Sequence, residues 1–114
     1  MTFKGRCHCG KITYEVDAET QPATACNCSI CSSRGYLLWF LPGDKLKLLA
    51  PLEDLSYYTF NTHKIRHYFC PACGGAPFGM AEHKGQPMAA VNVRCLEGVD
   101  LEKLEVKHFD GRKL

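Results

Sequence analysis

The cysteines are the residues of this chain whose type and spacing best suit chemistry. The sequence of 114 residues contains eight of them. Seven fall into three groups, a local triad and two distant pairs: Cys26, Cys28 and Cys31; Cys7 and Cys9; Cys70 and Cys73. Four thiolates close a tetrahedral zinc site, whereas three leave one position open for a reacting molecule. The grouping therefore predicts metal binding, with chemistry at a three-cysteine site.

Disulfide bonds are the alternative use of the eight cysteines, because the number is even. Disulfides persist in oxidising compartments, and secreted chains begin with an apolar signal segment. The residues from Met1 to Arg6 contain no such apolar run. We therefore interpret the cysteines as zinc ligands and expect a cytoplasmic protein, with a secreted disulfide scaffold as the alternative.

The composition is that of an ordinary globular protein, with 46% hydrophobic and 23% charged residues. The length predicts a single domain over residues 1–114. The net charge is only +2 and basic residues alternate with acidic ones, so no basic stripe indicates nucleic-acid binding. The longest apolar run, Tyr36 to Leu41, is too short to cross a bilayer. We expect neither a nucleic acid nor a membrane as partner.

Extended segments and turns must bring the thiols together. In an extended Cys7-His8-Cys9, the first and third side chains share a face, so both sulfurs reach one ion while His8 points away. The flanking glycines allow the backbone to turn tightly there. The alternating segment Lys11–Val16 predicts a half-buried strand with three side chains inward: Ile12, Tyr14 and Val16.

The triad lies on one local piece of chain. An extended Cys26-x-Cys28 presents two thiolates on one side, and Cys28-x-x-Cys31 suits a tight turn or the first turn of a helix. Together they place three sulfurs around one ion. Nearby serines are expected to donate hydrogen bonds to the thiolates: Ser29, Ser32 and Ser33.

The downstream pair lies in Cys70-Pro71-Ala72-Cys73-Gly74, which has the pattern of a zinc knuckle. Proline fixes the turn, the two sulfurs converge, and glycine frees the following amides to bond to sulfur. A redox Cys-x-x-Cys motif is the competing interpretation, but it calls for a βαβ pattern that this sequence lacks. We interpret the pair as metal ligands.

The rest of the chain predicts short strands. Tyr36–Leu41 reads as a buried strand ending at Pro42, with Trp39 and Phe40 in the core rather than in a substrate pocket. Further strands are expected at Lys45–Leu49, Leu55–Phe60, Ile65–Phe69, Pro77–Met80, Met88–Arg94 and Glu105–Phe109, with a hairpin turn at Asn61–Lys64 and one helical turn at Leu101–Leu104. No long 3.6-residue periodicity occurs, so the fold class is mainly β.

Spacing alone allows several groupings of the ligands. Cys28 and Cys31 with Cys70 and Cys73 would form an ordinary zinc ribbon, but this grouping leaves three cysteines unused. Keeping the triad intact leaves the two pairs to form one closed site, and no cysteine of the seven is then unused. We prefer the second grouping for that reason.

The pattern Gly5-x-Cys7-x-Cys9-Gly10-x-x-x-Tyr14, followed by Cys26-x-Cys28-x-x-Cys31 and Phe69-Cys70-x-x-Cys73-Gly74, resembles the glutathione-dependent formaldehyde-activating enzyme family, also called the GFA or CENP-V domain family. The resemblance extends from about Thr2 to Val99 and includes Asn92–Leu96 as a late strand and turn. It implies an Mss4-like fold of several small coiled β-sheets. It also implies a structural zinc on one ligand set and a second zinc on the other: Cys7, Cys9, Cys70 and Cys73; Cys26, Cys28 and Cys31.

The resemblance implies a zinc-dependent carbon–sulfur lyase acting on a thiol adduct of a small aldehyde, similar to S-hydroxymethylglutathione. The small-molecule partner would be a thiol or its adduct, with glutathione as the candidate that the family's name suggests. Zinc on three thiolates is a weak activator of water but deprotonates an incoming thiol. The alternative is a non-catalytic, zinc-stabilised binding module.

Other residues are candidates for supporting roles. His63 or His67 would serve as general acid or base, although each also fits a solvated or packed position. Three arginines suit a substrate carboxylate, with ordinary surface positions as the alternative: Arg34, Arg66 and Arg94. Cys95 would complete the second site as a fourth ligand or pack as a small buried side chain, and we favour burial.

Overall fold

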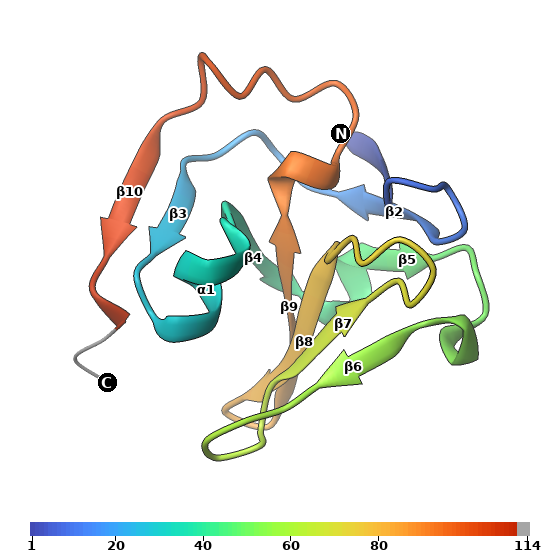
Figure 1. The fold of residues 1–114 in the computed structure, drawn as a ribbon. Helices are drawn as coiled ribbons and strands as arrows, with labels where there is room; N and C mark the ends of the chain where they lie inside the picture. The colour runs from blue at the N-terminus through green and yellow to red at the C-terminus, as the bar shows by residue number, and fades with distance from the viewer. Residues whose placement is uncertain (112–114) are drawn as a thin grey trace.

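A computed structural model describes residues 1–111, in which ten strands form two sheets (Figure 1). The smaller sheet has the order β1-β2-β5 and the larger one the order β10-β3-β4-β9-β8-β7-β6. The strands are β1 (Thr2–Arg6), β2 (Thr13–Asp17), β3 (Ala23–Cys26), β4 (Leu38–Pro42), β5 (Leu46–Leu48), β6 (Ser56–Tyr58), β7 (Arg66–Phe69), β8 (Phe78–His83), β9 (Gln86–Asn92) and β10 (Val106–Phe109). The expected mainly β class is confirmed, and the arrangement agrees with an Mss4-like fold.

The helices are short. They are α1 (Ser29–Arg34) and three single-turn 3-10 helices: η1 (Gly43–Lys45), η2 (Leu52–Asp54) and η3 (Val93–Cys95). Within residues 1–111 no helix is both long enough and apolar enough to span a bilayer.

One core cluster joins the two sheets. Phe3 of β1 meets Trp39 of β4 edge to face, with ring centroids 5.4 Å apart, and Tyr14 of β2 meets Phe78 of β8 in the same manner. The inward side chains predicted for the second strand are all buried: Ile12, Tyr14 and Val16. Trp39 also donates a hydrogen bond through Nε1 to the Gln21 carbonyl at 2.9 Å. These ring contacts therefore pack the smaller sheet against the larger one.

Alternation along β4 gives Trp39 and Phe40 different environments. Trp39 is buried in the main core, but Phe40 is 52% exposed, so the prediction that both pack in the core is wrong for Phe40. Successive side chains of a strand point to opposite faces, and Phe40 shares its face with Leu38. Leu38 belongs to a second, smaller buried cluster with Ile30 and Cys31.

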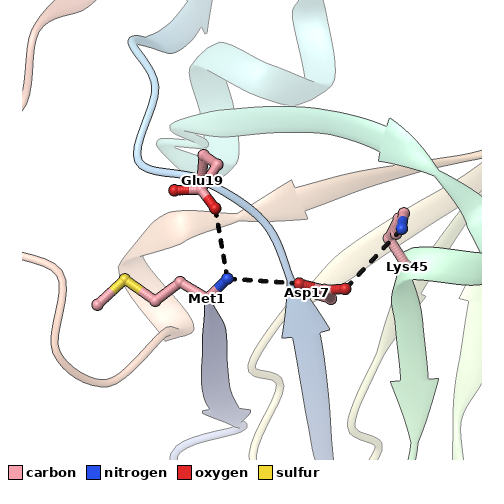
Figure 2. A network of polar contacts seen from close by, with 4 residues as sticks. All are labelled: Met1, Asp17, Glu19 and Lys45. Atoms are coloured by element: carbon pink, nitrogen blue, oxygen red, sulfur yellow. Dashed lines mark ion pairs between the residues drawn. The ribbon is translucent and has the colours of Figure 1, made fainter.

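Surface ion pairs hold the N-terminal edge of the smaller sheet (Figure 2). The Met1 amino group lies 3.5 Å from both the Asp17 and the Glu19 carboxylate, and Lys45 lies 3.8 Å from Asp17. These groups are mostly exposed, and such pairs contribute about 0–1 kcal/mol each. They align strand ends without determining the fold.

Several segments differ from the sequence-based expectation. The strand at Thr2–Arg6 was not predicted, because Phe3 is its one large inward side chain and gives a weak alternation. The strand expected to reach Arg94 ends at Asn92, whose side-chain oxygen accepts a hydrogen bond from the Arg94 amide and begins η3. Leu101–Leu104 forms a turn and not a helical turn.

Candidate metal centres

The first sulfur group joins Cys7 and Cys9 to Cys70 and Cys73, and it could hold a metal ion. All four Sγ atoms lie within 4.8 Å of one another. The Sγ atoms of Cys7 and Cys9 are 3.6 Å apart, and those of Cys9 and Cys70 are 3.7 Å apart. A tetrahedron with Zn–S bonds of about 2.3 Å has sulfur–sulfur edges of about 3.8 Å. The group therefore fits zinc, and these separations greatly exceed a disulfide bond of about 2.0 Å.

Two similar turns hold these sulfurs. In the first turn, the Gly10 amide donates to the Cys7 carbonyl at 3.1 Å, and the Ile12 amide donates to Cys7 Sγ at 3.3 Å. In the second turn, the Gly74 amide donates to the Cys70 carbonyl at 2.7 Å. Gly10 and Gly74 have φ values of 81° and 78°, which other residues rarely adopt. The tight turn predicted after Cys9 is thus confirmed, and the Gly75 amide donates to Cys73 Sγ at 3.4 Å, as predicted for the amide that follows Gly74.

The pKa shifts of these cysteines show how closely their sulfur atoms interact. The amides of Cys9 and Gly75 lower the pKa of Cys73 to about 6. The Lys11 amide acts in the same direction on Cys9, but the adjacent thiols of Cys7 and Cys70 raise its pKa to about 11. Four sulfurs this close repel one another as thiolates, and a bound cation removes that repulsion.

The second sulfur group is the triad Cys26, Cys28 and Cys31, and it too could hold a metal ion. Cys26 ends β3, Cys28 is the N-cap residue of α1, and Cys31 lies inside that helix. The Cys28 amide donates to Cys26 Sγ at 3.4 Å. Of the two local structures expected for Cys28-x-x-Cys31, the structure has the helical turn.

The start of α1 favours a thiolate on Cys28. Burial opposes ionisation of this side chain, but hydrogen bonds from the Cys31 amide and from the Cys31 and Cys26 thiols outweigh it, so the pKa of Cys28 falls below its ordinary value. Burial raises the pKa of Cys31, and the adjacent Cys28 sulfur raises it further because a second negative charge beside it is unfavourable. The expected serine donors are not seen in the described residues, and the Ser33 hydroxyl instead donates to the Ile30 carbonyl at 3.1 Å.

The C-terminal strand lies beside the triad. β10 runs parallel to β3 (Figure 1). Phe109 lies opposite Cys26, and the Asn27 amide donates to the Phe109 carbonyl at 3.2 Å. Gly111 follows, and a Cβ atom there would collide with Cys26 Sγ. Sequence reasoning missed this contact, although the alternation of residues 105–109 did predict the strand.

A cavity of about 680 Å³ opens beside the triad, and all three of its cysteines line it. Its apolar wall comes from α1, β4, the loop between β6 and β7, and β10: Ile30, Leu38, Phe40, Phe60, Ile65 and Phe109. This is the size of a small-molecule site. Phe40, which the sequence placed in the core, lines this cavity.

The structure separates the two candidate histidines. His67 of β7 lines the cavity and is only 8% exposed, and its ring stacks on Phe60 with centroids 5.5 Å apart. Burial, and to a lesser degree the Arg34 charge, lowers the pKa of His67. His63 is exposed and shares a hydrogen bond with the Thr59 hydroxyl at 2.9 Å. Only His67 is placed to meet a ligand of the cavity beside the triad.

The candidate arginines are engaged elsewhere. Arg34 donates to the Tyr36 hydroxyl at 2.9 Å and lies over the Phe69 ring, and Arg66 lies over the Tyr57 ring. Arg94 donates to the Gly35 carbonyl at 3.1 Å. The lining of the cavity includes none of these three arginines.

Cys95 lies outside both sulfur groups. Its Sγ atom is 3.7 Å from Asn92 Nδ2 and 3.9 Å from the Ala76 carbonyl oxygen. Burial raises the pKa of its thiol. These contacts support a partly buried thiol rather than a fourth ligand, as the sequence favoured.

Comparison with known proteins agrees with this arrangement. The structure resembles the crystal structure of a Rhodobacter sphaeroides protein, with a TM-score of 0.78 and 30% sequence identity. The alignment covers 91% of this chain and 99% of that chain. The family model described as glutathione-dependent formaldehyde-activating enzyme matches residues 2–109. With both sulfur groups inside that match, the chain belongs to the glutathione-dependent formaldehyde-activating enzyme family.

Proposed function

We propose that this protein is a zinc-dependent carbon–sulfur lyase that forms or cleaves the adduct of a thiol and a small aldehyde. The observation that carries the proposal is the position of the triad on the wall of a ligand-sized cavity. Zinc held by Cys7, Cys9, Cys70 and Cys73 would be structural. Zinc held by Cys26, Cys28 and Cys31 would lower the pKa of a thiol, so that a thiolate is available at neutral pH.

The reaction joins a thiol to a carbonyl carbon and is reversible. In the forward direction the sulfur forms a bond to the carbonyl carbon, the carbonyl π pair moves to oxygen, and the proton lost by the thiol is returned to that oxygen. Cleavage takes the same steps in reverse. The protein must hold the two reactants together, exclude water and move one proton.

We assign the proton transfer to His67. It lines the cavity, and its lowered pKa keeps the imidazole neutral at neutral pH. A neutral imidazole can accept the hydroxyl proton of the adduct as the carbon–sulfur bond breaks, and can donate it in the opposite direction. The apolar wall of the cavity limits water around the reacting atoms.

Free thiol ligands and a thiol substrate both fit a reducing compartment, so we also propose a cytoplasmic location. None of the eight cysteines, all of which lie within residues 1–111, forms a disulfide bond in the structure. The family's name suggests glutathione as the thiol.

The alternative is a zinc-stabilised binding module without catalysis. The contact between Gly111 and Cys26 favours it, because the C-terminal segment covers part of the triad. In this case both metals would be inert to added thiol. The test is the zinc content and the rate of thiol–aldehyde adduct exchange of the wild type, Cys28→Ser and Cys95→Ser proteins.

The proposal expects Cys28→Ser to lose one zinc per chain and its exchange activity, and Cys95→Ser to keep both, because Cys95 lies outside the sulfur groups. A Cys28→Ser protein that lost its second zinc and kept full activity would refute the assignment. Two zinc ions that resist exchange, with no activity in the wild type, would favour the binding module.

A further inference from the structure

The cavity beside the triad contains no charged partner for a ligand. None of the described residues that line it is an aspartate, glutamate, lysine or arginine. Its one ionisable side chain other than the cysteines and Tyr36 is His67, whose pKa is lowered by burial. Away from the triad itself, a ligand in this cavity is therefore surrounded by apolar walls and neutral polar groups.

Two of the polar side chains at the cavity, Asn92 and Tyr36, already have protein partners. Asn92 Nδ2 donates to the Ala76 carbonyl at 3.1 Å, and its Oδ1 accepts from the Arg94 amide at 3.2 Å. The Tyr36 hydroxyl accepts a hydrogen bond from Arg34. Within residues 1–111 the structure gives the His67 imidazole no hydrogen-bond partner, so this ring is free to bond to a neutral hydroxyl or carbonyl group.

Glutathione is poorly matched to such a site. It carries two carboxylates and one ammonium group, and its thiolate form adds another negative charge. Moving charges from water to an apolar site costs several kcal/mol for each group that finds no partner. Volume does not exclude the tripeptide, since about 680 Å³ is ample. The mismatch lies between the charged groups of glutathione and a cavity lining that, among the described residues, has no charged side chains to pair with them.

We propose that the thiol bound by this chain carries an uncharged, apolar substituent, such as an aromatic ring or a branched alkyl group, rather than the charged arms of glutathione. This inference rests on the proposed function of the triad and names its substrate class. The sulfur lies at the triad, the apolar substituent packs on Phe40, Phe60 and Phe109, and His67 bonds to the adduct hydroxyl. Burying one ring in this way favours binding by at least about tenfold over a charged thiol of equal acidity.

The test is isothermal titration calorimetry of the full zinc-loaded chain with benzyl mercaptan and with glutathione. A zinc-sensitive dye in parallel samples detects any metal removed by the thiols. We expect benzyl mercaptan to bind at least about tenfold more tightly than glutathione, with both zinc ions retained. Binding is read without reference to turnover.

A matched pair of lysine variants tests the location. Phe40 and Leu49 are 52% and 51% exposed, but only Phe40 lines the cavity. Phe40→Lys is expected to weaken the binding of benzyl mercaptan at least about fivefold, because it removes a ring. It should also reduce the preference for benzyl mercaptan over glutathione, because it adds a cation. Leu49→Lys adds the same charge and is expected to bind both thiols as the wild type does.

Glutathione binding as tight as that of benzyl mercaptan would overturn this inference and leave the proposed function standing. Arg112 and Lys113 lie outside the described residues, so the double variant Arg112→Gln, Lys113→Gln is included. Loss of glutathione binding in that variant would identify the anion partner and refute an uncharged site. A wild-type chain that holds only one zinc, or that binds neither thiol with both zinc ions present, would overturn the proposed function as well.

Discussion

Gly111 lies directly against Cys26, so closely that a Cβ atom at position 111 would collide with the Cys26 sulfur. The two residues meet because β10 runs parallel to β3 and places Phe109 opposite Cys26. The end of the described chain is therefore part of the wall around the triad. This relationship makes position 111 a direct probe of the second metal group.

Replacement of Gly111 by alanine should weaken metal binding at the triad. The added methyl group must displace Cys26 or the C-terminal segment, and overpacking of this kind costs about 1–3 kcal/mol. We expect Gly111→Ala to lower the zinc affinity of the second site by about tenfold or more, measured by competition with a chromophoric chelator. His108→Ala, an exposed change on β10 just before Gly111, is the control and should bind zinc as the wild type does. Equal affinities in the two variants would contradict the contact.

Loss of the four-cysteine group should cost more stability than loss of the triad. Cys9 and Cys70 are separated by 61 positions, so a shared ion closes a long loop and joins the two sheets. Structural zinc contributes on the order of ten kcal/mol to folding in zinc-finger peptides. We expect Cys70→Ser to abolish cooperative thermal unfolding, followed by circular dichroism, whereas Cys28→Ser keeps a cooperative transition.

Removal of metal provides an independent check on the same comparison. Stepwise chelation should release the triad metal first, with little change in the melting curve. Release of the second equivalent should coincide with unfolding. A chain that stays folded without any metal would show that the four-cysteine group is not required for stability.

His67 should make the free energy of unfolding decrease as the pH falls. Its pKa is lowered in the folded protein by burial and by the Arg34 charge, whereas the pKa of an unfolded histidine is about 6.5. Below that pH the unfolded state binds the proton first, so the stability due to His67 is present above about pH 6.5 and falls as the pH decreases through the folded pKa.

The variant His67→Gln removes this dependence. Urea unfolding between pH 7.5 and pH 5.5 should show a shallower loss of unfolding free energy than in the wild type, by at most about 1.4 kcal/mol per pH unit. Protonation of the cysteines affects both proteins alike and cancels in the difference. The control His63→Gln changes an exposed residue outside this cavity and should follow the wild type. Parallel curves for wild type and His67→Gln would refute the burial of the imidazole.

The folded protein should be more stable when Tyr14 lacks its hydroxyl group. The side chain is buried, and its hydroxyl oxygen has no hydrogen-bond partner in residues 1–111. An unpaired buried polar group costs about 1–3 kcal/mol, so Tyr14→Phe should raise the free energy of unfolding by about 1 kcal/mol. Chemical denaturation measures the change. Destabilisation by a similar amount would show that the hydroxyl makes a bond.

Gly5→Ala is the opposite change at the same contact. A Cβ atom at position 5 would collide with the Tyr14 ring, which packs across the glycine. The backbone of β1 and the ring of β2 must then separate, and a loss of about 1–3 kcal/mol is expected. The two variants together test whether the ring lies over the glycine as the structure has it.

Short-range patterns were sufficient to predict the local geometry of the ligands. The turns at the two cysteine pairs and the inward set of β2 follow from spacing within a few residues, and the helical turn after Cys28 is one of the two alternatives that spacing allowed. Such geometry depends on backbone periodicity and glycine conformation, which the sequence carries directly. The grouping of Cys7 and Cys9 with Cys70 and Cys73 was preferred only because it used every thiol, and the structure brings those four together.

Long-range pairing could not be predicted in the same way. The sequence alone determined the ligand types, their local turns and the mainly β class, because each depends on neighbours along the chain. Only the tertiary structure decided that Gly111 covers Cys26, that Phe40 and His67 face the cavity while Trp39 faces the core, and that no charged residue of the described chain lines it. These features depend on strand order and register, which bring together segments such as β3 and β10 that are distant in the sequence.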